Sequence, residues 1–153
     1  MHLSRLHYAM FAGLVLVSNL TLAQKSPLTE FLNSGKIVPT TMPFSEAVKV
    51  NDTLYLSGQL GNIPGTMKLV PGGIKEETRQ TMNNIKTVLE AHGYSLRNLV
   101  KCTVMLADIA EWSAFNDIYK TYFDTQYPAR SAFATNGLAL GARVEIDCIA
   151  AAS

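Results

Sequence analysis

Residues 99–106 read LVKCTVML, and this apolar run with β-branched side chains predicts a buried strand in the middle of the chain. Helical periodicity precedes it: five apolar residues recur on one 3.6-residue stripe, namely Ile74, Met82, Ile85, Val88 and Leu89. Gly93 then fits the left-handed position that ends a helix. After the strand, Asp108 can cap a second helix, whose apolar face would consist of Trp112, Phe115, Ile118, Tyr119 and Tyr122. The middle of the chain is therefore expected to fold as helix, strand, helix.

Pairs of strands are expected on both sides of this segment. Residues 47–50 and 53–58 surround the polar pair Asn51-Asp52, which predicts a hairpin, and residues 59–73 form a Gly- and Pro-rich loop. Residues 130–135 and 142–151 flank Asn136-Gly137 and Gly141, and we expect another hairpin or a wider turn there. The order β-β-α-β-α-β-β predicts an α+β fold, a mixed sheet with two helices on one face.

The first residues have the order of a secretory signal peptide. A short segment carrying Arg5 precedes the uncharged run AMFAGLVLV at residues 9–17, and Thr21-Leu22-Ala23 supplies small residues at the −3 and −1 positions. We expect residues 1–23 to be removed and the protein to be exported, into a periplasm or the medium. The alternatives are an amphipathic or disordered N-terminus in a cytosolic protein and a retained membrane anchor. Residues 24–42 are expected to lie across the surface as a leader, ahead of one domain over residues 43–153.

The charge balance limits the possible partners. The chain has 13 basic and 12 acidic residues, and the first 23 residues contain Arg5 and no acid, so 12 basic residues remain against 12 acidic ones. A neutral chain without a basic run lacks the electrostatic footprint of a nucleic-acid-binding protein. No second apolar run is long enough to span a bilayer, so we expect no membrane contact after cleavage.

Cys102 and Cys148 are the only cysteines. An even number in an oxidising compartment favours a disulfide, but both lie in apolar, strand-like runs, where a buried free thiol behaves as a small hydrophobe. We expect two reduced, buried thiols. We expect no metal, because zinc usually takes four ligands and the mature chain adds only His92 to these thiols. His92 itself is expected to be an exposed cation at the end of the first helix.

Arg130 and Glu145 are the main candidates for chemistry. Arg130 begins an apolar strand, where a guanidinium needs an anionic partner and can hold a carboxylate through two parallel hydrogen bonds. The alternative is an edge arginine that reaches solvent. Strand alternation places Glu145 and Asp147 on one face of the last strand, away from Val144, Ile146 and Cys148. That face is either solvated or, if Arg130 lines it, a place where a carboxylate can orient a ligand or activate water.

Ser57-Gly58-Gln59 closes a strand with a glycine, which allows a ligand or another strand to approach the backbone closely. Ser57 is a poor candidate nucleophile, because it needs a base and His92 lies at the end of an amphipathic helix.

Several segments together resemble one known family. They are PFSEAV (43–48), SGQ (57–59), the helix with TRQ (78–80) and NIK (84–86), VKCTV (100–104), FNDIY (115–119), YPARS (127–131) and VEIDCIA (144–150). In this order they are similar to the RidA/YjgF family, the reactive-intermediate deaminases, also called the L-PSP endoribonuclease family. The resemblance extends from about Pro43 to Ala151. It implies a chorismate-mutase-like α+β subunit in a homotrimer with pockets between subunits.

The resemblance also implies cofactor-free hydrolysis of 2-aminoacrylate and related enamines or imines to 2-keto acids and ammonia. Arg130 would bind the substrate carboxylate and Glu145 would orient the water. Three further residues would line the pocket: Gly58, Asn116 and, through its backbone, Ala132. Two positions depart from the family pattern. Phe44 occupies the place of a pocket tyrosine, and Ala132 stands where a cysteine often follows Arg-Ser.

Two other functions compete with the deaminase. A non-catalytic module of the same fold would keep the carboxylate site and lack turnover. Ribonuclease activity follows from the family's older name, but the neutral charge and the absence of a pair of acid–base histidines count against it.

Overall fold

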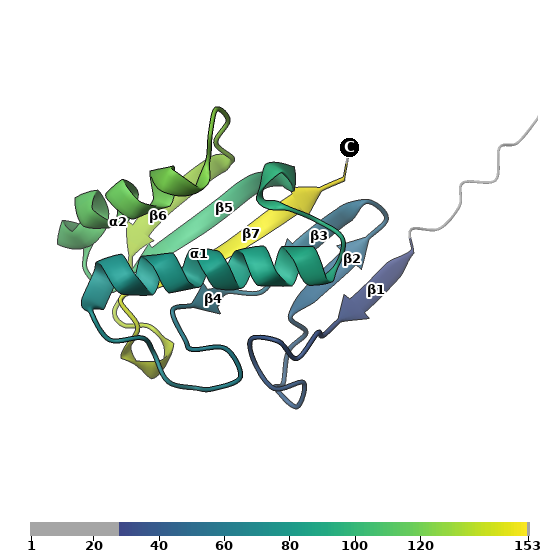
Figure 1. The fold of residues 1–153 in the computed structure, drawn as a ribbon, viewed down its shortest axis with the longest axis horizontal. Coiled ribbons are helices and arrows are strands. Elements are labelled where there is room, and N and C mark those ends of the chain that lie inside the picture. The colour runs from purple at the N-terminus through teal and green to yellow at the C-terminus, as the bar shows by residue number, and fades with distance from the viewer. Residues whose placement is uncertain (1–27, 153) are drawn as a thin grey trace, which may run out of the picture.

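The computed structural model describes residues 28–152, which form one mixed sheet and the helices that cover one of its faces (Figure 1). The expected signal peptide lies outside these residues. The strands are β1 (Thr29–Leu32), β2 (Ala47–Val50), β3 (Thr53–Leu56), β4 (Gln59–Leu60), β5 (Leu99–Leu106), β6 (Ala129–Ala134) and β7 (Val144–Ala151). The α-helices are α1 (Gly73–Ala91) and α2 (Trp112–Tyr119), and short 3-10 turns cover Leu96–Asn98, Ile109–Glu111, Lys120–Tyr122 and Ala139–Gly141. The expected α+β class is confirmed.

The strand order is β1-β2-β3-β7-β5-β6, and β4 adds to β7 beside β3. The expected hairpin of β2 and β3 is present, with Ala47 opposite Leu56. For residues 130–151 a hairpin or a wider turn was expected; the hairpin is wrong, because β5 lies between β6 and β7. β6 runs parallel to β5, with Arg130 beside Cys102, whereas every other pair is antiparallel. Parallel neighbours need a crossover connection, and α2 provides it.

The segment expected to be a surface leader contributes to the fold. Thr29–Leu32 adds an edge strand to β2, and Ile37 is buried in the core. β1 is short and its outward side chain Phe31 is exposed, so neither length nor alternation distinguished it in the sequence.

The core lies between the sheet and the helices. α1 crosses the sheet in Figure 1, and its buried stripe includes Met82, Ile85, Val88 and Leu89, as the helical period predicts. The chain leaves the helix at Gly93, whose φ of +81° is a conformation that other residues rarely adopt. Among residues 28–152, no helix combines the length and the apolarity needed to cross a membrane.

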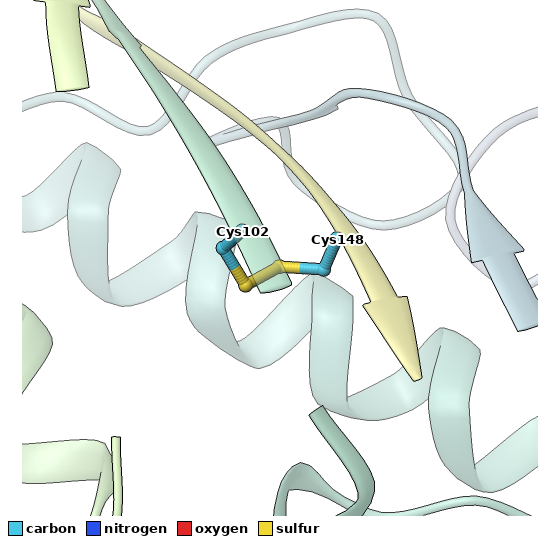
Figure 2. Close-up of a disulfide and its surroundings, with 2 residues drawn as sticks. All are labelled: Cys102 and Cys148. Atoms are coloured by element: carbon cyan, nitrogen blue, oxygen red, sulfur yellow. A yellow bond between two sulfur atoms is a disulfide. The ribbon is translucent and has the colours of Figure 1, made fainter. Parts of the chain in front are cut away.

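Cys102 and Cys148 form a disulfide, so the expectation of reduced thiols is wrong (Figure 2). The two residues lie directly opposite each other on β5 and β7, with Cα atoms 4.1 Å apart. Both are buried, as expected, and they point to the face that the helices cover. The alternation of each strand placed both sulfurs inside the core. Only the register between the strands places them within bonding distance.

Candidate functional site

Arg130 lies on the helix-covered face of β6. Its neighbour in register, Cys102, is buried on that face, and its guanidinium lies against aromatic rings of α2. The Cζ atom is 4.8 Å from the ring centroid of Tyr119, 5.6 Å from that of Phe115 and 5.8 Å from that of Trp112. Aromatic faces attract a guanidinium and hold its plane. Among the described residues no carboxylate forms an ion pair with Arg130, so its charge is available to an anionic ligand.

A pocket of about 460 Å³ opens beside this guanidinium. It is lined by Asn116, Tyr119, Lys120, Tyr127, Pro128 and Arg130. Asn116 and Tyr119 are three residues apart on α2 and therefore share a face of that helix. The structure thus brings Asn116 to Arg130. A larger groove of about 770 Å³, between the end of α1 and residues 122–127, contains none of the predicted site residues.

Gly58 and Glu145 lie next to each other, outside the Arg130 pocket. Gly58 lies between β3 and β4, and β4 pairs Leu60 with Glu145 of β7. A Cβ atom at residue 58 would overlap Glu145 Oε1 and lie 2.9 Å from Glu145 Cδ. The glycine is therefore required for the Glu145 carboxylate to occupy this position. Phe44 lies shortly before β2. The carbonyl of the next residue, Ser45, accepts a hydrogen bond of 2.7 Å from Ser57 Oγ, and Ser57 directly precedes Gly58.

Glu145 is half-buried on the open face of the sheet, together with Asp147. Burial raises the pKa of Glu145 above its usual value, and the charge of Asp147 raises it further. Within residues 28–152 no side chain or backbone N–H donates a hydrogen bond to the side-chain carboxylate of Glu145, so the carboxylate oxygens are available to water or a ligand. A carboxylate whose pKa is raised is a stronger base than an exposed one.

Within one chain Arg130 and Glu145 lie on opposite faces of the sheet. Arg130 faces the helices, whereas Glu145 alternates with the buried Val144 and Ile146 and faces away from them. β5 also separates their strands. The hypothesis that Arg130 lines the Glu145 face from a neighbouring strand is therefore wrong. Ala132 lies on the Arg130 side and packs against the core.

His92 is not the exposed cation expected from its place at the end of α1. Its Nε2 lies 2.9 Å from Glu46 Oε1, and both side chains are nearly buried. Glu46 also accepts hydrogen bonds from the backbone N–H and the hydroxyl of Ser34. These contacts hold Glu46, the residue before β2, against His92 at the end of α1. Ser57 uses its hydroxyl to bind the Ser45 carbonyl, consistent with a structural role.

Tyr119 and Tyr127 are pocket residues that the sequence did not reveal. Tyr119 was expected in the core, and it is buried there, but one side of it borders the Arg130 pocket. The signal available was its spacing of three residues from Asn116 on α2. In the part of the chain that the structure describes, no group of three or more His, Cys, Asp or Glu side chains is placed to hold a metal ion.

The site thus has two parts on one α+β subunit: the guanidinium of Arg130, which has no ion-pair partner among the described residues, and the half-buried carboxylate of Glu145 at a separate place. Comparison with known proteins identifies the family. The profile of the family described as Endoribonuclease L-PSP matches residues 35–152, and the chain belongs to this family. A goat (Capra hircus) protein named 2-iminobutanoate/2-iminopropanoate deaminase is 46% identical over 125 residues, which are 82% of this chain and 91% of the goat protein.

Solved structures agree with this assignment. The yeast protein YEO7 is 38% identical with a TM-score of 0.77, and the match covers 82% of this chain and all (100%) of the yeast chain. YyfA of Yersinia pestis, described as a member of the conserved Rid protein family, is 36% identical with a TM-score of 0.77 over 82% of this chain and 100% of its own. The RidA/YjgF resemblance and its fold are confirmed.

Proposed function

We propose that this protein is a cofactor-free enamine and imine deaminase that converts small 2-imino acids, such as 2-iminopropanoate, to 2-keto acids and ammonia. The observation that carries the proposal is Arg130, whose guanidinium lies against aromatic rings in a pocket and has no ion-pair partner among the described residues. The chain is also 46% identical to a protein named for this activity. The guanidinium fork suits the carboxylate that every 2-imino acid carries.

Glu145 supplies the base. The carboxylate takes a proton from water while the water oxygen forms a bond to C2 of the protonated imine, giving a tetrahedral carbinolamine. Glu145 then returns this proton to the nitrogen, the C–N bond breaks and ammonia leaves. The hydroxyl of C2 passes its proton through solvent water to the departing ammonia, which gives the 2-keto acid and an ammonium ion. The raised pKa of Glu145 makes its carboxylate a better base than an exposed one.

A complete site requires two copies of the chain. Arg130 and Glu145 lie on opposite faces of one sheet, so one small substrate cannot contact both in a single subunit. The open face also exposes apolar side chains: Phe31 is 73% exposed, and Tyr55 and Phe133 are each 47% exposed. Apolar side chains exposed together on one face indicate an interaction surface. We therefore propose a homotrimer in which Glu145 of one copy approaches Arg130 of the next.

Mixing two inactive variants tests the shared site. Arg130→Ala should lower kcat/KM about 30- to 1,000-fold, the loss of a charge-assisted pair worth about 2–4 kcal/mol. Glu145→Gln should lower kcat and spare binding of pyruvate. If subunits are unfolded and refolded together in equal amounts, about a quarter of the interfaces carry both native residues, and about a quarter of wild-type activity should return.

Matched variants and mass measurements complete the test. Arg79→Ala removes an exposed guanidinium elsewhere and should leave activity unchanged. Light scattering should give three times the subunit mass. A stable monomer, or a mixture of variants with no recovered activity, contradicts the shared site. Pyruvate binding without any turnover by the wild type would favour the non-catalytic module.

We also propose that the mature chain works outside the cytosol. The order of residues 1–23 supports export, and so does the Cys102–Cys148 disulfide, because disulfides persist mainly in oxidising compartments. Mass spectrometry of the native protein should find Gln24 as the first residue, in the periplasmic or secreted fraction. A chain that begins at Met1 in the cytosol contradicts this proposal.

A further inference from the structure

Tyr119 has a hydroxyl whose hydrogen bond the chain does not provide. The residue is 3% exposed, and its Oη is buried without a partner among the described residues. A buried hydroxyl without a hydrogen bond is unfavourable, and such groups are rare in folded proteins. Thr81 Oγ1 is the only other such side-chain atom in residues 28–152, and Thr81 borders neither pocket.

The place of Tyr119 distinguishes it from Thr81. Its ring is the nearest of the three that surround the Arg130 guanidinium, and it lines the same pocket. Burial raises the pKa of Tyr119 to about 12, while the charge of Arg130 lowers it and Tyr127 raises it. The Cζ atom of Arg130 lies 4.8 Å from the ring centroid of Tyr119, so the ring and the guanidinium are neighbours in this pocket. At neutral pH the hydroxyl keeps its proton, and it is a donor that no described residue satisfies.

We propose that the Tyr119 hydroxyl donates a hydrogen bond to the carboxylate of the ligand that Arg130 holds, and so contributes to binding and selection of that ligand. A carboxylate has about four acceptor positions, and the guanidinium fork uses two of them. A neutral donor beside the fork fills another. This inference rests on the proposed function, because it takes the small 2-keto or 2-imino acid as the ligand.

Pyruvate binding measured by calorimetry tests the inference in the full mature chain. Tyr119→Phe removes only the oxygen and should weaken binding about tenfold, the size of one lost hydrogen bond. Because this hydroxyl has no partner in the chain, the variant should unfold at the same denaturant concentration as the wild type or a higher one. In the imine assay its KM should rise more than its kcat falls, since the carboxylate is held alike in ground and transition states.

Tyr122→Phe is the matched control. Its hydroxyl lies 3.0 Å from the Arg79 carbonyl and 3.0 Å from Asn83 Oδ1, outside the Arg130 pocket. The control should show the reverse pattern, with unchanged pyruvate binding and lower stability.

Two results overturn the role of Tyr119. Equal affinity of wild type and Tyr119→Phe would do so, as would a Tyr119→Phe protein that dissociates into monomers at concentrations where the wild type is assembled. Arg130→Ala separates this failure from that of the proposed site. If Arg130→Ala loses binding and Tyr119→Phe does not, only the inference fails. If the wild type binds no pyruvate, the inference and the carboxylate site fail together.

Discussion

Reduction of the Cys102–Cys148 disulfide should strongly destabilise the fold. The bond joins β5 and β7, neighbouring strands inside the sheet, and both cysteines are buried under the helices. The residues are 46 positions apart in sequence, so the bond closes a long loop in the unfolded chain. A disulfide stabilises mainly by restricting the unfolded state, and its effect grows with the length of the loop.

The magnitude follows from the loop length. A loop of 46 residues removes about 13–14 cal/mol/K of entropy from the unfolded chain, which is about 4 kcal/mol at 25 °C. For a domain of this size, each kcal/mol shifts Tm by about 3–5 °C, so reduction should lower Tm by about 12–20 °C.

Guanidinium denaturation of the wild type with and without a phosphine reductant measures this difference. The protein concentration must be the same in both arms, because assembly shifts the apparent stability. The double variant Cys102→Ala/Cys148→Ala is the control: it should be at least as unstable as the reduced wild type, and reductant should not change it. The intact mass should rise by about two daltons on reduction of the unfolded wild type. Equal midpoints for oxidised and reduced protein, or an unchanged mass, would contradict a stabilising disulfide.

The other predictions concern the site. Gly58→Ala should lower turnover of 2-iminopropanoate about 10- to 100-fold, because the new Cβ would displace the Glu145 carboxylate. The chain should remain folded, because the backbone at residue 58 is not left-handed. Turnover equal to that of the wild type, with an unchanged thermal unfolding curve, contradicts this prediction. The rate should fall as pH drops through the raised pKa of Glu145. In the pH–rate profile of Asp147→Asn, this fall should occur at lower pH, because the charge of Asp147 contributes to raising the pKa. A fall at the same pH as in the wild type would exclude Asp147 as a cause of the raised pKa of Glu145. Because that pKa is raised on folding, the native state loses stability as pH rises through it. Glu145→Gln should therefore resist denaturant better than the wild type at about pH 8 and equally at about pH 4, and the reverse order would be inconsistent with a raised pKa. Arg130→Lys should have a kcat/KM between those of wild type and Arg130→Ala, because an ammonium lacks the planar fork; full activity in steady-state kinetics would argue against bidentate binding.

The sequence alone determined the local elements and the sidedness of each strand. The hairpin of β2 and β3, helix α1 and strand β5 follow from patterns that repeat over a few residues, which is the range at which backbone geometry acts. Alternation along β7 correctly placed Cys148 inside and Glu145 outside. The motifs around Arg130 and Glu145 identified the family.

Tertiary structure alone decided which elements are neighbours. β5 inserts between β6 and β7, and this single arrangement excludes their hairpin and brings Cys102 opposite Cys148. The register, with Arg130 beside Cys102 and Cys102 opposite Cys148, places Arg130 on the face opposite to that of Glu145. The order of strands in a sheet depends on the packing of the whole core and on the crossover through α2, and no local pattern records it. The buried pair of His92 and Glu46 has the same origin, because the two residues are 46 positions apart in the chain.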